Sequence, residues 1–214
     1  MTTPASVLTY DSLTALVLQY LERSDPAVVA FIPQAIMLAE FEIAQDIKTL
    51  GQMQVAVSGM LSGNPVIAKP ARWRKTVSMT IIDASNNRQP VFLRKLEYLW
   101  SYTPDTVGGV GTPIYYADYD ADHWLVAPSP GPGLQFEVLY YARLAPLSSD
   151  NQTNWLTQNA PNAMLYGTLK QTAPFLKDDA RLAVWGGLFD AALGALKIED
   201  QLRVGDRQSI VQDS

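Results

Sequence analysis

Apolar residues recur at helical spacing in the first fifty residues of the chain. Asp11 is placed to cap a short amphipathic helix whose apolar face holds Leu13, Leu16, Val17, Tyr20 and Leu21. Asp25-Pro26 can begin a further helical turn. Pro33 can occupy the first turn of a longer helix, with Ile36, Ala39, Ile43, Ile47 and Leu50 on one face. The N-terminal part is therefore predicted to be helical.

From Gln54 the pattern changes to short runs of β-branched and aromatic residues separated by glycine, proline and asparagine, which is typical of strands. Val55 and Val57 alternate with small or polar residues in the first run. The later runs are residues 75–82, 90–93, 114–119, 124–127 and 134–140. Leu96, Leu99 and Trp100 have the spacing of a helical turn. The middle is predicted to be an antiparallel β unit of five or six strands.

Helical spacing returns in the C-terminal part. Pro161 suits the first position of a helix, and Pro174 is expected to end it. Asp178-Asp179 then supplies a carboxylate cap for a second helix that carries Leu182, Trp185, Phe189, Ala192 and Leu196 at spacings of three and four. Gly205 is the expected end of this helix, and the polar residues after it are predicted to form a tail.

Helices before and after a β unit favour an α+β fold. The simplest architecture is an α-helical bundle of about four main helices with an inserted small antiparallel β domain, sandwich-like or barrel-like. Residues 1–52 and 148–204 are predicted to be the two halves of the helical domain, because neither half has enough apolar surface alone. Residues 53–147 form the predicted β domain, and 205–214 the flexible C-terminal tail.

Composition removes several classes of protein. The chain has no cysteine, which excludes disulfide scaffolds, thiolate metal sites and cysteine nucleophiles. The N-terminus lacks the pattern of a signal peptide, and no run is expected to reach the roughly 20 apolar residues of a membrane span. A soluble, cytosolic protein with no membrane partner is expected.

Charge is unevenly distributed. The net charge of −5 argues against nucleic-acid binding over the whole surface. Between residues 69 and 95, however, one acid, Asp83, stands against seven basic residues: Lys69, Arg72, Arg74, Lys75, Arg88, Arg94 and Lys95. Trp73 offers Arg72 and Arg74 a cation–π partner. Three interpretations remain open: a solvated strand face, pairing with acidic surface on a neighbouring subunit, and contact with passing DNA.

Candidate catalytic and metal-binding residues are few. His123 is the only histidine and is interpreted as a strand-edge residue beside Trp124. Asp118, Asp120 and Asp122 imitate the start of a calcium loop, but its glycine and its bidentate glutamate are missing, which favours a hydrated hairpin tip. Residues 107–111 are glycine-rich without the lysine of a phosphate loop. We therefore predict no catalytic residue, no metal site and no cofactor.

Four aromatic residues have the spacing of core anchors: Trp155, Tyr166, Trp185 and Phe189. Aromatic side chains are also enriched at the centres of protein interfaces, so the sequence leaves both interpretations open.

The motifs NWL (154–156), NAP (159–161), LYG (165–167) and APFLKDD (173–179), with Trp185 after them, resemble the C-terminal part of the adaptor proteins of tailed bacteriophages, also called gateway or head-to-tail connector proteins. The resemblance extends upstream to PIYYA (113–117), LVAPSP (125–130) and VLYY (138–141). It covers the second half of the chain by motif and the first half only by pattern. The chain departs from the family at 118–122, where a glycine-containing turn is usual.

The resemblance implies a structural virion protein rather than an enzyme. It implies a ring of about twelve copies beneath the portal, which extends the DNA channel and provides the tail attachment site. The implied partners are the portal protein, a tail or nozzle protein, further copies of itself and double-stranded DNA in passage. The implied location is the neck of the virion, after assembly from the host cytoplasm.

Mapped onto this chain, the portal-binding extension is the segment after Arg203, with Arg207, Ile210 and Val211 as its contacts. The basic residues Lys69, Arg72, Arg74, Lys75, Arg94 and Lys95 are the candidates for a subunit interface or for the wall of the DNA channel. Two alternatives are a small β-barrel nucleic-acid-binding module embedded in a helical scaffold and a virion-associated hydrolase.

Overall fold

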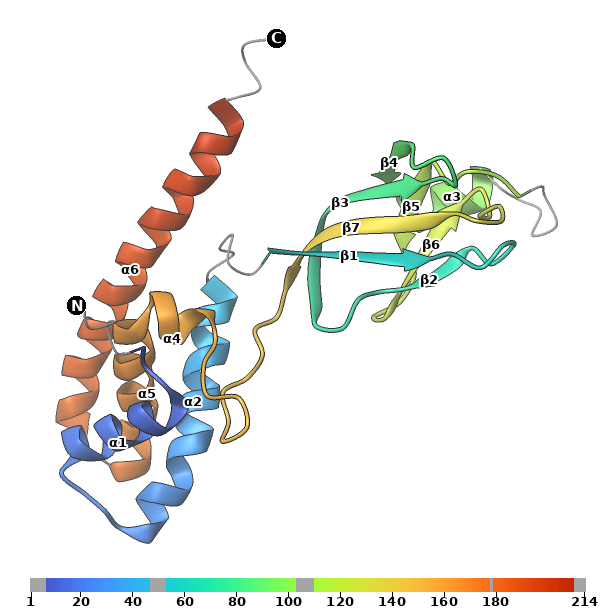
Figure 1. Cartoon of the computed structure of the whole chain (residues 1–214). Helices are drawn as coiled ribbons and strands as arrows, with labels where there is room; N and C mark the ends of the chain where they lie inside the picture. Colours follow the sequence, from blue (N-terminus) through green and yellow to red (C-terminus); the bar gives the residue numbers. More distant parts are fainter. Residues whose placement is uncertain (1–6, 47–52, 103–109, 178, 210–214) are drawn as a thin grey trace, which may run out of the picture. The chain divides into compact units, whose positions relative to one another are not determined.

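The computed structural model describes residues 7–46, 53–102, 110–177 and 179–209, with the side chains of residues 179, 200 and 202–209 left undescribed. The chain divides into two compact units, each shown in Figure 1. Both ends of the chain, residues 1–52 and 144–214, form the helical unit, and residues 53–143 form the β unit. The predicted α+β class is confirmed. The β unit ends at residue 143, earlier than the predicted 147.

Five helices of the helical unit lie within the described residues: α1 (Tyr10–Leu21), α2 (Pro26–Asp46), α4 (Trp155–Asn159), α5 (Pro161–Leu176) and α6 (Asp179–Ser209). Thr9, not Asp11, caps α1. The Thr9 hydroxyl accepts the backbone N–H of Ser12, and the Ser12 hydroxyl accepts the N–H of Thr9. This reciprocal capping box satisfies two backbone donors, whereas Asp11 sits inside the first turn.

Helix α2 begins at Pro26 rather than at Pro33, which lies inside the helix. By length and composition α2 could cross a membrane, contrary to the expectation from the sequence that no run would be apolar enough. Its inner face nevertheless packs in the core of the helical unit, through Val28, Ile32, Ala35, Ile36, Ala39 and Ile43. The apolar length of α2 thus serves packing between helices. The predicted core positions Ile47 and Leu50 lie outside the described residues.

The C-terminal helices agree with the prediction at Pro161 but differ from it at Pro174 and at Gly205. Pro161 does occupy the start of α5, but Pro174 lies within this helix, which ends at Leu176. Lys177 then adopts a left-handed conformation, with φ of 57°, and separates α5 from α6. The backbone of α6 continues through Gly205 to Ser209, so residues 205–209 of the predicted tail are helical.

The core of the helical unit is built around α5, which lies between α2 and α6 in Figure 1. Gly167 on α5 makes this close packing possible. A Cβ atom at Gly167 would lie 3.0 Å from the Phe189 ring on α6 and 3.2 Å from Cβ of Ala39 on α2. Phe189 is 1% exposed and Trp185 7%. Trp155 and Tyr166 are partly buried against the same core.

A buried carboxylate joins α2 to the segment that returns from the β unit. Both oxygens of Glu40 accept the backbone N–H of Leu147, at 3.2 and 3.3 Å. Oε1 of Glu40 also accepts the side-chain amide of Asn154 at 2.6 Å, and the Asn154 carbonyl caps α4 by accepting the N–H groups of Leu156 and Thr157. Desolvation by burial raises the pKa of Glu40, although these hydrogen bonds oppose the shift.

Within the described residues, the β unit is a curled sheet of seven strands. The sequence predicted five or six. The seven strands are β1 (Met53–Gly59), β2 (Val66–Ala68), β3 (Trp73–Ile82), β4 (Arg88–Leu93), β5 (Tyr115–Asp118), β6 (His123–Ala127) and β7 (Gln135–Ala142), with α3 (Leu96–Tyr102) after β4. The strand order is β1-β7-β3-β4-β5-β6-β2. The neighbouring strands pair antiparallel, except for a short parallel contact between β4 and β5.

The inner face of this sheet packs around Trp124, which is fully buried. The rings of Trp73, Tyr116 and Phe136 meet its ring edge to face. Strand β7 follows the alternation expected of a half-buried strand, with Phe136, Val138, Tyr140 and Ala142 buried. Edge strand β1 does not: its alternating Val55 and Val57 are exposed, at 60% and 52%, although their pattern predicts burial.

Glu40 generates a prediction about stability and its pH dependence. Replacing Glu40 by Ala leaves the N–H of Leu147 without its acceptor and is expected to lower the free energy of unfolding by about 1–3 kcal/mol. Glu40→Gln keeps an acceptor oxygen and is expected to lose less. Chemical denaturation of the purified variants measures both.

Because the pKa of Glu40 is raised in the folded state, the unfolded chain releases this proton first as the pH rises. The contribution of the protonated carboxyl is complete below the ordinary pKa of 4.5 and is lost as the pH rises through the folded pKa. Glu40→Gln removes this part of the pH dependence. Parallel stability profiles for wild type and Glu40→Gln would contradict the assignment.

Trp185 generates a second prediction. Truncation to Ala is expected to lower the free energy of unfolding by about 3–5 kcal/mol, as for other buried large aromatic residues. The matched control is Trp100→Ala, because Trp100 on α3 is 55% exposed. Denaturation followed by far-UV circular dichroism compares the two. Equal effects would show that Trp185 is not a core anchor.

Candidate interaction surfaces

The basic residues between 69 and 95 differ in how exposed they are. The side chain of Lys69 is buried. Its ammonium lies 3.1 Å from Oδ1 of Asp118 and donates a 2.7 Å hydrogen bond to the carbonyl oxygen of Asp120. It also lies 4.1 Å from the centre of the Trp73 ring. Lys69 is therefore a cation whose contact with the ring of Trp73 the structure shows.

This geometry gives Lys69 a structural role within the β unit. Its side chain is 5% exposed, and its charge is used to hold the β5–β6 hairpin, which includes Asp118 and Asp120, against the β2–β3 corner. The sequence signal for this role was available in principle, since an aspartate-rich hairpin needs a compensating cation. The sequence does not show which of the seven basic residues contacts this hairpin.

The other basic residues near the start of β3 are more accessible. Arg72 adopts a left-handed conformation with φ of 60° at the corner before β3, and its carbonyl accepts the N–H of Arg143 at 2.6 Å. Arg74 is half-buried, and Lys75 is exposed. Arg88, on β4, forms an ion pair with Glu137 of β7. Of this group, Arg72 and Lys75 are both exposed at the surface of the β unit.

Arg94 and Lys95 lie at a different place, the junction of β4 and α3. Both are exposed and line an open hollow of about 860 Å³ together with Leu93, Leu96, Glu97 and Asp118. The guanidinium of Arg94 lies 5.5 Å from the ring centre of Tyr115 and 6.0 Å from that of Tyr98. Arg94, one of the residues that line the hollow, thus lies beside two aromatic rings, and cations next to aromatic rings are frequent at protein interfaces.

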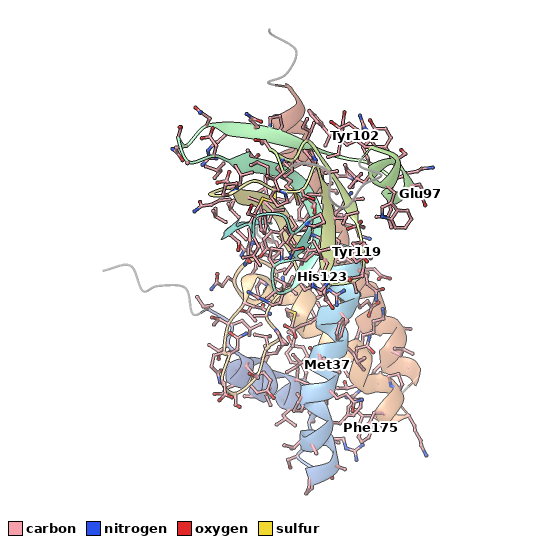
Figure 2. The ribbon with its side chains drawn as sticks, turned by 90° about the vertical axis from the view of Figure 1, so that its right-hand side faces the viewer. Met37, Glu97, Tyr102, Tyr119, His123 and Phe175 are labelled. Carbon is pink, nitrogen blue, oxygen red and sulfur yellow. The ribbon has the colours of Figure 1, made fainter. Side chains whose placement is uncertain are left out.

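An aromatic cluster that the sequence reasoning missed borders this hollow. Tyr98 and Tyr102 of α3 stack with ring centres 6.1 Å apart, and both meet Tyr115 of β5 edge to face. The hydrogen bond with Tyr115 raises the pKa of the Tyr98 hydroxyl. Trp100, Phe92 and Leu93 are exposed beside them. Figure 2 shows Tyr102 and Glu97 on α3. The density of aromatic residues between 98 and 102 was the available signal.

The acidic hairpin tip is organised by its own hydrogen bonds. Asp120 accepts the backbone N–H of Asp122 at 2.8 Å, and its carboxylate lies 2.9 Å from Nδ1 of His123. The N–H of Asp122 is the largest cause of the lowered pKa of Asp120, and His123 adds to it. No group of three or more His, Cys, Asp or Glu side chains in the described part of the chain is arranged to hold a metal ion. His123 begins β6, next to the buried Trp124.

The predicted portal-binding residues cannot be placed. Ile210 and Val211 lie outside the described residues, and for Arg207 only the helical backbone of α6 is described. Residues 107–109 of the glycine-rich segment 107–111 also lie outside the described residues. Of its last residues, Gly111 pairs with Pro130 through an isolated bridge.

Comparison with known proteins gives one result for nearly the whole chain. The family model described as SU10 adaptor protein matches residues 8–211. A comparison with curated proteins gives no match. The matched region includes the helical unit, the β unit with its hollow, and the helix α6. The chain therefore belongs to the SU10 adaptor protein family, a family of phage adaptors.

Proposed function

We propose that this phage structural protein forms a ring of about twelve copies beneath the portal, extends the DNA channel and provides the attachment site for the tail. The observation that carries the proposal is the family match over residues 8–211. An adaptor is a virion component that associates with other virion components such as portal or tail. The proposed position is the neck, after assembly from the host cytoplasm.

The division of the chain into two units supports contacts with different partners. The helical unit carries eight basic and fourteen acidic residues, a formal charge of −6, and the β unit eight basic and seven acidic residues, +1. The acidic helical unit contains α6, which includes the proposed portal-binding residue Arg207, and the proposed residues Ile210 and Val211 follow α6 in the sequence. The β unit carries the hollow beside Arg94 and Lys95, which we assign to a tail protein or neighbouring subunit.

Nucleic-acid binding by the β unit is a second candidate function. Exposed aromatic residues beside Arg94 and Lys95 have the chemistry on which bases of a single strand can stack. Double-stranded DNA in a channel, however, presents phosphates rather than base faces, and an acidic ring repels them. We therefore assign this surface to protein contact. Filter binding of single-stranded DNA at low and physiological salt tests the alternative.

The C-terminal extension gives a prediction about portal binding. Deleting residues 206–214 is expected to leave folding intact, because the described core of the helical unit ends at Leu196. Portal affinity is expected to fall by at least about tenfold, equivalent to ~1.4 kcal/mol. Deletion of residues 213–214 alone is the control, since it retains Ile210 and Val211. Co-sedimentation with purified portal measures binding; full-stoichiometry binding by the longer deletion would refute this role.

The exposed cations of the β unit give a prediction about assembly. The double reversal Arg94→Glu and Lys95→Glu is expected to leave the monomer folded, because exposed charges contribute only ~0–1 kcal/mol each. Assembly on portal, or attachment of tails, is expected to weaken and to lose its salt dependence. Reversal of Arg23, an exposed residue of the helical unit, is the control. If particles with the double reversal assemble, keep their DNA and infect normally, Arg94 and Lys95 are solvated residues without a role in assembly.

A further inference from the structure

Strand β1 is an open edge of the curled sheet. It stands first in the strand order β1-β7-β3-β4-β5-β6-β2, with β7 as its neighbour. β1 and β2 follow one another in the chain, yet within the described residues they do not pair, so the sheet curls without closing. The edge strand of an open sheet presents backbone N–H and C=O groups that can pair with a further strand.

The register between β1 and β7 shows which backbone groups point outward. Met60 continues this register after β1, and its N–H donates to the carbonyl oxygen of Leu134 at 2.9 Å. Along an antiparallel pair, residues that exchange hydrogen bonds alternate with residues that do not. The backbone groups directed at β7 are therefore those of Gln54, Ala56 and Ser58. The groups directed away from β7, toward the open edge, are those of Val55, Val57 and Gly59.

β1 lacks the features that usually protect an edge strand. It is seven residues long, contains neither a charged residue nor a proline, and pairs with β7 in an unbroken register. Short length, charges, prolines and bulges are the devices that keep other chains from adding to an edge. The side chains of Val55 and Val57 are 60% and 52% exposed, so the strand is accessible along its outer face.

The other edge of the same sheet, β2, is protected. It has three residues and follows Pro65. The carbonyl oxygen of Pro65 accepts the N–H of Val126, so by the same alternation the N–H of Val66 points away from β6. This N–H donates to Oδ1 of Asn64 at 3.0 Å. The short edge is thus satisfied within the chain, whereas the longer edge, β1, is open.

We propose that β1 receives an extended segment of a different virion protein as an additional strand of the sheet. The row of donors and acceptors on Val55, Val57 and Gly59 is complementary to an extended backbone, which is the chemistry of strand addition. Val55 and Val57 also place apolar side chains on the outer face, so the added segment carries apolar residues at alternate positions. This inference rests on the proposed function, in which the chain binds other virion proteins.

The symmetry of a ring excludes the sheet edges of a second copy as the source of this strand. Pairing of β1 with β1 is a two-fold contact, whereas neighbours in a ring of about twelve copies meet through two different surfaces. The edge that could supply a different surface is β2, but it is short and its outward N–H at Val66 is already bonded to Asn64. The added strand therefore comes from a different protein.

Amide hydrogen exchange followed by NMR tests the assignment of the backbone groups. In the free protein, the N–H groups of Gln54, Ala56 and Ser58 are expected to exchange slowly, because β7 accepts them, and those of Val55 and Val57 rapidly. With a strand added at the edge, exchange at Val55 and Val57 is expected to slow by at least about tenfold. Slow exchange of all five N–H groups in the free protein overturns the proposal.

Proline substitution separates the two sides of β1. Proline lacks an N–H and is accepted on an edge strand where that N–H would face solvent. Val57→Pro is therefore expected to keep the unfolding midpoint within a few degrees of wild type, while it blocks an added strand. Ala56→Pro is expected to lower the midpoint clearly, because it removes a hydrogen bond to β7. Val57→Thr is the matched control for binding, since it keeps the N–H and a β-branched side chain.

A short capped peptide that alternates threonine with valine is the probe for strand addition. At millimolar concentration it is expected to bind wild type and Val57→Thr and to slow exchange at Val55 and Val57. Its affinity for Val57→Pro is expected to be at least about tenfold lower, measured by NMR titration. Absence of binding to wild type, or equal binding to Val57→Pro, overturns the proposal.

Binding of purified portal and tail proteins distinguishes this inference from the proposed function. Val57→Pro is expected to bind one of these proteins at least about tenfold more weakly, and Val57→Thr to bind both as wild type does. If Val57→Pro binds both normally, the inference fails and the proposed function stands. If wild type binds neither protein but takes the peptide at β1, the proposed function fails and strand addition stands. A dimer of wild type that Val57→Pro abolishes would show pairing of β1 with β1 and overturns the proposal.

Discussion

The buried carboxylate of Glu40 fixes how the two ends of the chain meet. It accepts the N–H of Leu147 and the side-chain amide of Asn154, while Asn154 caps α4. One group on α2 thus sets the position at which the chain re-enters the helical unit after the β unit. Burial makes this arrangement demanding, because an ionised carboxylate in the core is tolerated only where donors surround it.

Lys69 has the corresponding role in the β unit. Its ammonium joins the acidic β5–β6 hairpin to the corner before β3 and lies over the ring of Trp73. With this cation committed to the fold, the exposed charges nearest the aromatic cluster are Arg94 and Lys95, beside an open hollow. Within the β unit, Lys69 and Arg88 are thus paired with acidic residues, whereas Arg94 and Lys95 are exposed at the surface.

The sequence by itself determined the α+β class, the helical character of the N-terminal and C-terminal parts of the chain, most strand positions and the family. These features depend on local periodicity and on motifs such as NAP and APFLKDD. It determined the position of Pro161 at the start of α5, because a proline restricts its own backbone and lacks an N–H. The sequence predicted the cap of α1 wrongly. Thr9 and Ser12, rather than Asp11, cap this helix through a reciprocal pair of hydrogen bonds, which the preference of one residue type for the cap position does not predict.

Only the tertiary structure decided which side chains are covered. Val55 and Val57 alternate as core residues do, yet the curl of the sheet leaves them outside on β1. Lys69 and Lys75 are equivalent by composition, but only Lys69 reaches Asp118. The glycines of α6 are equally indistinguishable by sequence from Gly167, which has neighbours where Gly187 has none. Burial depends on which distant segments come together, and residue spacing along one chain does not contain that information.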